Sequence, residues 1–296
     1  MVSSYPLVLG TAQFGLPYGI ANKTGVPDQA MATDIVREAW ENGIEEFDTA
    51  QAYGESESIL GEALGELGLS QKAKIISKFD PNLDHLNATA MSRSLDQSLQ
   101  RLGIQSLYGI MLHREELLSF WNKGLSGILH DSVLSGRVKQ VGVSVYSPDK
   151  AVQALKTEGI DIVQLPTNVL DRRFEKAGIF QLADKKKRKV YIRSIFLQGL
   201  LLMDVEEIPE KMTFARPMIE RFESFSRDSG LTRQEIALGY LRMEAPGAKV
   251  IFGADTPEQV RENLRTWEKD ISFSLVSEVK EIFGGVDEKI LNPGLW

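Results

Sequence analysis

Four side chains that can hold or move protons follow short apolar runs of the sequence. Asp48, Lys78 and His113 each end or follow such a run, and Tyr53 lies shortly after Asp48. If these runs are parallel strands of an α/β barrel, their carboxyl ends form one face, where the loops carry the functional residues. The arrangement predicts that a carboxylate, an ammonium, an imidazole and a phenol meet at one mouth.

Together these groups can reduce a carbonyl, which needs a hydride at carbon and a proton at oxygen. A phenol with a pKa of about 10 is a poor acid at neutral pH. The ammonium of Lys78 should lower the pKa of Tyr53, and Asp48 should keep Lys78 protonated. His113 can donate a hydrogen bond to the oxygen on which negative charge develops. This chemistry needs no metal, and the sequence shows no metal-ligand motif.

Each side chain alone also has a purely structural explanation. Asp48 can cap a turn, and Lys78 can be a solvated strand end. Tyr53 can stabilise its own loop, and His113 can be a core residue. One shared site explains all four positions at once, whereas the structural explanations need four coincidences.

Short apolar runs alternate with longer amphipathic stretches along the whole sequence. The predicted strands are Leu7–Gly10, Glu46–Asp48, Lys74–Lys78, Leu107–Leu112, Gln140–Val143, Ile162–Leu165, Lys189–Ser194 and Val250–Phe252. They are rich in Val, Ile and Leu without strict polar alternation, as is typical of parallel strands covered on both faces. Eight successive strand–helix units predict a closed (β/α)8 TIM barrel of the α/β class, as a single domain over residues 1–296.

The amphipathic stretches predict the helices that cover this barrel. They are Asp28–Asn42, Ser56–Leu67, Ala88–Leu102, Gly127–Ser135, Pro148–Glu158, Phe180–Lys187, Met218–Ser229, Gln234–Met243, Thr256–Thr266 and Ser274–Phe283. Two of them lie between the last two strands, so this crossover has an extra helix. Only six residues precede the first strand, too few for a full amino-terminal hairpin. We therefore expect another closure of the barrel, or a thinner floor.

Composition restricts the partners and the compartment. The net charge of −7 disfavours nucleic acid and acidic membranes as partners. The chain has no cysteine, which excludes disulfides and thiolate chemistry and is in keeping with a reducing compartment. No signal peptide or membrane span is visible, so we expect a cytoplasmic protein. The basic run over residues 185–189 is better explained as a solvated helix end than as a phosphate or nucleic-acid site.

The segment around Tyr53 resembles the signature of the aldo-keto reductases. It reads FDTAQAYG over residues 47–54 and continues with Ser56-Glu57 and Leu60-Gly61. The catalytic tetrad of that family falls on Asp48, Tyr53, Lys78 and His113, and none of the four is replaced. The resemblance implies an NAD(P)-dependent oxidoreductase that transfers hydride between nicotinamide and an aldehyde, ketone or alcohol. The opening segment 9–19 resembles bacterial members linked to sugar and surface-polysaccharide metabolism, which suggests a sugar or another polar aldehyde.

The resemblance also implies where the cofactor binds. The expected contacts are Gly10, Thr11, Ala12, Gln13, Asp48, Ser144, Gln164, Phe196, Gln198, Gly199, Leu200, Gly253, Ala254, Asp255, Gln259, Glu262 and Asn263. Tyr146 or Phe196 should stack on the nicotinamide ring. Gly253 and Gln259 stand where several branches have cations for the 2′-phosphate, and Asp255 adds a negative charge. NADP(H) is slightly favoured by the resemblance, and NAD(H) remains open.

The substrate should meet aromatic side chains at the mouth. The expected contacts are Phe14, Tyr18, Tyr53, His113, Tyr146 and Trp296, with Ile20 nearby. Trp296 belongs to a tail that often crosses the mouth in the family, although packing on the barrel exterior explains it equally well. The partner is thus a small carbonyl or alcohol, and no sequence feature specifies an oligomeric state.

Two other functions are compatible with the same barrel. One is a regulatory barrel that binds nicotinamide with little turnover, because fold alone does not define function. The other uses Lys78 as a Schiff-base lysine, which the neighbouring Asp48 disfavours because it keeps the amine protonated.

Overall fold

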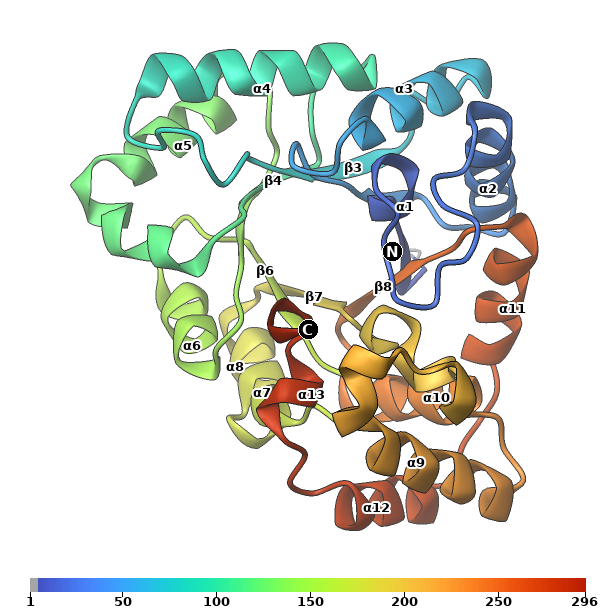
Figure 1. The fold of residues 1–296 in the computed structure, drawn as a ribbon. Coiled ribbons are helices and arrows are strands. Elements are labelled where there is room, and N and C mark those ends of the chain that lie inside the picture. Colours follow the sequence, from blue (N-terminus) through green and yellow to red (C-terminus); the bar gives the residue numbers. More distant parts are fainter. Residues whose placement is uncertain (1–4) are drawn as a thin grey trace.

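Eight parallel strands close into a barrel in the computed structural model of the chain, which describes residues 5–296 (Figure 1). The strands are β1 (Leu7–Gly10), β2 (Glu46–Asp48), β3 (Lys74–Lys78), β4 (Gly109–Leu112), β5 (Val141–Ser144), β6 (Ile162–Pro166), β7 (Lys189–Arg193) and β8 (Lys249–Gly253). Each strand pairs with its sequence neighbour, and β1 pairs with β8 from Leu7–Val250 to Gly10–Gly253. This last pairing closes the barrel and leaves no sheet edge among these eight strands.

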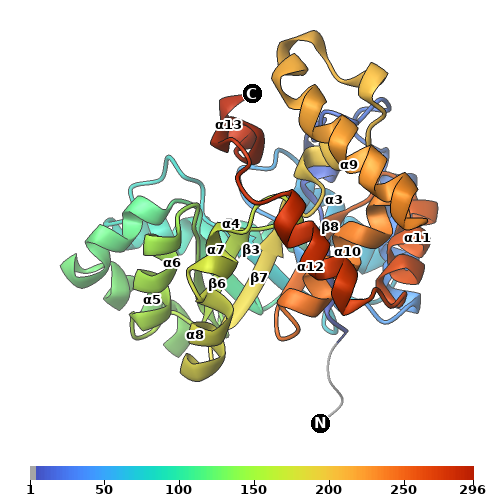
Figure 2. The same ribbon diagram turned by 90° about the horizontal axis from the view of Figure 1, so that it is seen from below.

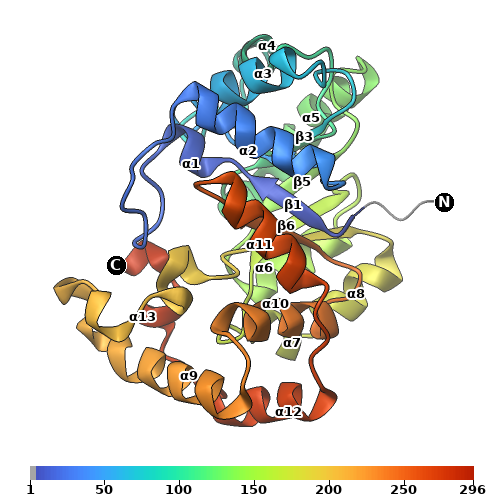
Figure 3. The same cartoon turned by 90° about the vertical axis from the view of Figure 1, so that its right-hand side faces the viewer.

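Helices surround the barrel and follow the strands in turn (Figure 1). The α-helices are α1 (Ala12–Gly15), α2 (Gln29–Glu41), α3 (Ser56–Glu66), α4 (Ala88–Leu102), α5 (Leu125–Leu134), α6 (Pro148–Lys156), α7 (Arg173–Lys176), α8 (Ile179–Lys186), α9 (Arg216–Ser229), α10 (Arg233–Glu244), α11 (Pro257–Trp267), α12 (Phe273–Ile282) and α13 (Glu288–Leu291). The 3₁₀-helices are η1 (Glu115–Lys123), η2 (Leu197–Leu202), η3 (Val205–Glu207), η4 (Glu210–Ala215) and η5 (Pro293–Leu295). In Figures 2 and 3, α13 and the carboxyl terminus lie beyond one end of the barrel, on the same side as the segment between β7 and α9.

The predicted α/β barrel is confirmed, including the extra helix before the last strand, where both α9 and α10 lie. Strand limits differ slightly. β4 begins at Gly109 because Leu107 makes only an isolated bridge to Val138. β5 begins and ends one residue later than predicted. The proposed lack of an amino-terminal hairpin concerns residues 1–6, of which 1–4 lie outside the described part of the chain.

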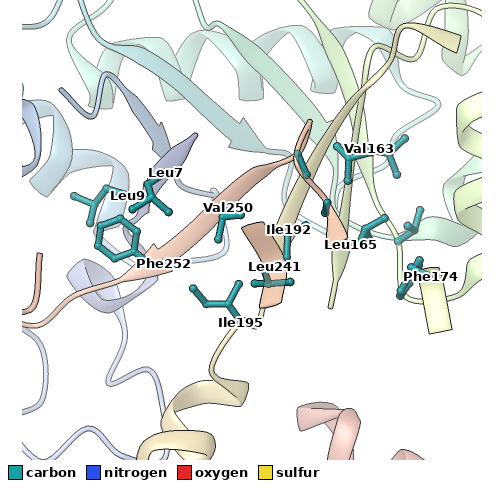
Figure 4. Packing of buried hydrophobic residues seen from close by; sticks show 14 of the residues in the cluster. Leu7, Leu9, Val163, Leu165, Phe174, Ile192, Ile195, Leu241, Val250 and Phe252 are labelled. Atoms are coloured by element: carbon teal, nitrogen blue, oxygen red, sulfur yellow. The ribbon is translucent and has the colours of Figure 1, made fainter. Parts of the chain in front are cut away.

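Side chains alternate between the two faces of each strand. On β1, Leu7 and Leu9 point outward and pack with Val250 and Phe252 of β8 under the helices (Figure 4). The intervening Val8 points into the barrel, where it joins a small apolar layer. That layer consists of Val8, Ile76, Met111, Ile162, Tyr191 and Ile251. The barrel interior is therefore filled by side chains, and the site can form only above this layer.

Below this layer, polar side chains close the amino-terminal end of the barrel. Glu46 accepts a hydrogen bond from the hydroxyl of Tyr191 (2.7 Å) and pairs with Lys249 (3.0 Å). Lys189 donates to the hydroxyl of Tyr108. Among the described residues, this end of the barrel is thus lined by the first side chains of β2, β7 and β8, which are Glu46, Lys189 and Lys249.

None of the helices in residues 5–296 is long and apolar enough to cross a membrane. Local sequence signals begin several of them. Asp28 caps α2 by accepting a hydrogen bond from Met31 N (2.8 Å), and Thr232 and Glu235 form a reciprocal capping box at the start of α10.

Two glycines of α3 should respond oppositely to the same substitution. A Cβ at Gly61 would lie 2.3 Å from the carbonyl oxygen of Arg101, whereas a Cβ at Gly65 would meet no atom within 4 Å. We expect Gly61→Ala to destabilise the protein by about 1–3 kcal/mol because α3 and α4 must separate. Gly65→Ala should stabilise it by about 0.5 kcal/mol through helix propensity. Urea denaturation of both variants measures the difference, and two shifts of the same sign would contradict the close helix contact.

Candidate active site

The last inward-facing residue of each strand contributes to the mouth of the barrel. Ile76 and Tyr191 point into the barrel. Because side chains alternate along a strand, Lys78 and Arg193, two positions further along, point inward as well. The same count around the barrel gives Gly10, Asp48, Lys78, His113, Ser144, Gln164, Arg193 and Gly253. Strand periodicity alone therefore brings three members of the predicted tetrad together.

A fully buried ion pair lies at the centre of this layer. Lys78 Nζ contacts Asp48 Oδ2 at 2.6 Å and Oδ1 at 2.9 Å, and it also donates to the carbonyl oxygen of Thr49 at 2.9 Å. Gln164 Nε2 donates to Asp48 Oδ1 at 2.7 Å. Burial lowers the pKa of Lys78, and the adjacent Asp48 carboxylate opposes that shift. Because all three N–H groups of the ammonium have acceptors, Lys78 is a charged anchor and is unsuited to nucleophilic attack.

Tyr53 lies beside this pair at the start of the loop that leads into α3. Lys78 Nζ lies 5.0 Å from the centre of the Tyr53 ring. Gly15 approaches the loop so closely that a Cβ there would lie 1.8 Å from the Tyr53 carbonyl oxygen. Ser56 further ties the loop to β1, because its hydroxyl donates to Thr11 O at 2.6 Å. The backbone of Tyr53 is thus held between the end of β1 and the start of α3.

The pKa of Tyr53 shifts in the direction opposite to the sequence-based expectation. Burial is the main cause and Asp48 the second, and both raise this pKa, which Arg193 lowers in part. Lys78 does not lower the pKa of Tyr53 as predicted, because the ammonium of Lys78 is already paired with the carboxylate of Asp48 at 2.6 Å. Tyr53 is consequently protonated over the physiological pH range and can act as a proton donor.

His113 faces Tyr53 from the end of β4. The two rings meet edge to face, with centroids 5.8 Å apart. Burial lowers the pKa of His113 to about 3, assisted by the positive charges of Lys78 and Arg193. The imidazole is therefore neutral at physiological pH, and its Nδ1 is buried without a hydrogen-bond partner among the described residues. A neutral imidazole retains one N–H that can bind a carbonyl oxygen.

A groove of about 550 Å³ runs from Tyr53 to the start of α11. Most of the residues predicted to hold a cofactor line it. They are Gly10, Thr11, Ala12, Gln13, Asp48, Gln164, Phe196, Gln198, Gly199, Gly253, Asp255, Gln259, Glu262 and Asn263, together with Tyr18 and Tyr53. The loop after β1 crosses this groove, since Ile20 N bonds to Gln198 O at 3.0 Å and Lys23 pairs with Glu207.

The groove suits a dinucleotide in shape and in donor groups. Its far end meets the amino terminus of α11, where the positive end of the helix dipole favours a phosphate, although Pro257 has no N–H and Gln259 N donates to Thr256. Gln259 Oε1 accepts from Asp255 N at 2.7 Å, which fixes this loop. Near Tyr53, the amide oxygen of Gln164 remains available because its amide nitrogen binds Asp48.

Several residues that were predicted to contact the cofactor or the substrate line neither this groove nor the second cavity described below. Phe14 is fully buried in the hydrophobic core, and so are Leu200 and Ala254, because their side chains point away from the groove. Ser144 is buried next to Gln164 without reaching the groove surface. Trp296 packs on its own tail, where its indole N–H donates to Lys289 O at 2.8 Å. The tail lies at the mouth side of the barrel (Figure 2) without forming the wall of either cavity.

A second cavity of about 720 Å³ opens next to His113. Its walls come from the segment after β3, from η1 and from the loop after β5. The lining residues are Pro81, Leu83, Asp84, His85, Leu86, His113, Arg114, Glu116, Leu117, Phe120 and Tyr146. We call this cavity the substrate-side cleft. It was missed in the sequence analysis apart from His113 and Tyr146, because the loops after β3 and β4 carry no distinctive motif.

Arg193 is the inward residue that sequence reasoning overlooked. It lines the groove, and its guanidinium carbon lies 4.2 Å from the centre of the Tyr146 ring in the cleft. Tyr146 thus stacks on Arg193 in the cleft, whereas Phe196, the other aromatic residue expected next to nicotinamide, lines the groove. The alternation from Tyr191 to Arg193 on β7 was the sequence signal that could have identified it.

Together the fold and the groove define a barrel oxidoreductase that acts on carbonyls with a dinucleotide cofactor. A family model described as "Aldo/keto reductase family" matches residues 6–283. The "NADH-specific methylglyoxal reductase" of Escherichia coli (strain K12) is 25% identical over 288 residues, which cover 86% of this chain and 88% of that protein. The "L-glyceraldehyde 3-phosphate reductase" of the same strain is 25% identical over 298 residues, covering 88% of this chain and 85% of that protein.

The fold is shared with an aldo/keto reductase from Klebsiella pneumoniae, solved in complex with NADP and acetate. The TM-score is 0.71 at 19% identity, over 94% of this chain and 91% of that chain. The chain belongs to the aldo/keto reductase family. It is an oxidoreductase that transfers hydride between a nicotinamide cofactor and a carbonyl or alcohol, as the sequence predicted.

The low pKa of His113 predicts a pH-dependent loss of stability. In the unfolded chain a histidine takes up a proton near its ordinary pKa of about 6.5, whereas folded His113 does so only at about 3. Between these values the unfolded state binds more protons, so the free energy of unfolding falls as the pH falls. We expect His113→Gln to lose less stability than the parent protein between pH 7 and pH 5, measured by urea denaturation. An equal loss in both proteins would show that folded His113 titrates normally.

Proposed function

We propose that this chain reduces a small aldehyde or ketone by using Tyr53 as the proton donor. The supporting observation is the buried Lys78–Asp48 pair, which lies 5.0 Å below the Tyr53 ring and keeps a protonated phenol at the mouth of the groove. No described residue hydrogen-bonds the Tyr53 hydroxyl, so the hydroxyl can bind a substrate oxygen. His113 faces the same point and supplies a second hydrogen-bond donor.

The residues divide the reaction as follows. When bound in the groove, a reduced nicotinamide would supply the hydride. His113 binds the carbonyl oxygen through its N–H and stabilises the negative charge that develops there. Tyr53 gives its proton to that oxygen, and in the oxidative direction the phenolate would take it back. Lys78 lies against the phenol ring, and Arg193, which lowers the pKa of Tyr53 in part, limits the cost of its transient negative charge.

The two competing functions receive less support. A Schiff-base lysine must lose a proton, but Lys78 is fully buried and each of its N–H groups has an acceptor. A regulatory barrel does not need a proton donor, whereas Tyr53 lines the groove next to an open cleft. Here the cleft of about 720 Å³ reaches His113, which is 5.8 Å from the Tyr53 ring. The cleft also carries the polar groups of Asp84, Arg114 and Glu116, which suit a sugar-like or other polar carbonyl substrate.

Removing the Tyr53 hydroxyl should strongly slow carbonyl reduction and leave cofactor binding intact. We expect Tyr53→Phe to lower kcat by about 10²- to 10⁴-fold, because the proton donor is lost. The dissociation constant of the reduced cofactor should change by less than about threefold, since the ring remains in place. Reduced-cofactor absorbance with a panel of aldehydes and calorimetric titration give the two quantities. Retention of near-full turnover in Tyr53→Phe would overturn the assignment of the donor.

We propose further that the groove prefers NAD(H), although the sequence resemblance slightly favoured NADP(H). A 2′-phosphate needs cations, but the far end of the groove presents the carboxylates of Asp255 and Glu262. In the described lining, the cation of this part of the groove is Lys23, and it is paired with Glu207. The relative in Escherichia coli that is named NADH-specific supports this preference.

Neutralising Asp255 should improve the binding of the phosphorylated cofactor selectively. We expect Asp255→Asn to tighten NADPH binding about tenfold relative to NADH, because a like-charge repulsion is removed. Calorimetric titrations with both cofactors measure this ratio. Asp270→Asn, which neutralises a carboxylate outside the groove lining, serves as the control. An unchanged ratio in Asp255→Asn would place the 2′ position away from Asp255.

A further inference from the structure

Among the described residues, Arg193 is the one cation of the groove lining that lacks a counter-ion. Its Nη1 donates weakly to Ser194 Oγ (3.3 Å), and its Nη2 is buried without a hydrogen-bond partner. No carboxylate of residues 5–296 forms an ion pair with it. Tyr146 covers one side of the guanidinium at 4.2 Å, and the side chain also lines the groove.

This guanidinium gives the reaction centre a net positive charge. Lys78 and Asp48 neutralise each other at 2.6 Å, while His113 and Tyr53 are uncharged at physiological pH. Arg193 acts electrostatically on all three proton-handling side chains, Tyr53, Lys78 and His113. Asp80 and Arg114 also act on His113, but with opposite signs. One positive charge therefore remains at the end of the groove nearest Tyr53.

The charge of a nicotinamide ring depends on its redox state. The oxidised ring is cationic, and the reduced ring is neutral, while the rest of the dinucleotide does not change. Hydride transfer to a carbonyl bound by Tyr53 requires the ring to lie at this end of the groove. The ring must therefore experience the field of Arg193, which is half-buried with its Nη2 shielded from solvent, so that this field is only partly screened.

We propose that Arg193 makes the site discriminate between the redox states of its cofactor, holding the reduced form more tightly than the oxidised form. Repulsion between two cations weakens binding of the oxidised form, and the guanidinium does not repel the neutral ring. After carbonyl reduction, the oxidised cofactor should consequently dissociate more readily. This inference rests on the proposed function, because it takes the groove to be the dinucleotide site.

The test compares the affinities of the two redox forms in three versions of the full-length protein. The ratio of dissociation constants, NAD⁺ over NADH, is measured by calorimetric titration at pH 7.5. We expect Arg193→Met to lower this ratio about tenfold, which corresponds to about 30 mV in the potential of the bound two-electron couple. Arg193→Lys keeps the charge and should retain most of the ratio. Arg193→Gln provides a second neutral variant if the methionine variant does not fold.

A matched control separates local from general charge effects. Arg114 also carries a positive charge at the mouth, but it lines the substrate-side cleft and not the groove. Arg114→Met should therefore leave the ratio unchanged. An equal effect of Arg193→Met and Arg114→Met would overturn the inference, since net charge alone would then explain the result.

The outcomes also distinguish this inference from the proposed function. If every variant binds cofactor and turns over, but the ratio does not respond to loss of the Arg193 charge, the inference is wrong and the proposed function stands. If the KM for anionic aldehydes rises in Arg193→Met while the ratio stays constant, Arg193 recognises a substrate anion instead. If the unmodified protein binds neither redox form, both the inference and the proposed function fail.

Discussion

The ion pair of Lys78 and Asp48 is the constraint on which the mouth of the barrel depends. Two charges without water are stable only when nearly all their hydrogen-bonding capacity is used, and here Thr49 O and the Gln164 amide complete the set. The strands β2, β3 and β6, together with the segment after β2, must therefore hold their register for the pair to persist. Removing one partner would leave an unpaired buried charge, at a cost of about 3–5 kcal/mol.

The architecture and the catalytic candidates were accessible from the sequence because they depend on local patterns. Short apolar runs define the strands, and the residue at the end of each run faces the mouth by simple alternation, as for Lys78. Loop-dependent features were not accessible. Phe14 appeared to be a pocket residue, but α1 turns it into the core. The substrate-side cleft depends on how the loops after β3 and β4 pack against each other, which no short motif encodes.

Electrostatics was the least predictable part of the site. A lysine near a tyrosine suggested a lowered phenol pKa, yet burial and Asp48 raise it. The sequence shows which charges are present but not which of them already have partners. Lys78 is satisfied by Asp48, whereas Arg193 is not satisfied by any described carboxylate. The unpaired charge of Arg193 therefore sets the field at the reaction centre, and the paired charge of Lys78, which belongs to the sequence motif, does not.

The apolar layer beneath the site also separates two sets of charges. Above it lies the Lys78–Asp48 pair, and below it lie Glu46 and Lys249, with Glu46 accepting a hydrogen bond from Tyr191 of the layer itself. The layer consists of apolar side chains and Tyr191, and such an environment screens charges weakly. Burial and Glu46 raise the pKa of Tyr191, which belongs to the layer, and Asp48 adds a smaller contribution from the mouth side. The end of the barrel usually associated with stability is thus electrically coupled to the end that performs chemistry, and a charge change at Glu46 is not silent for catalysis.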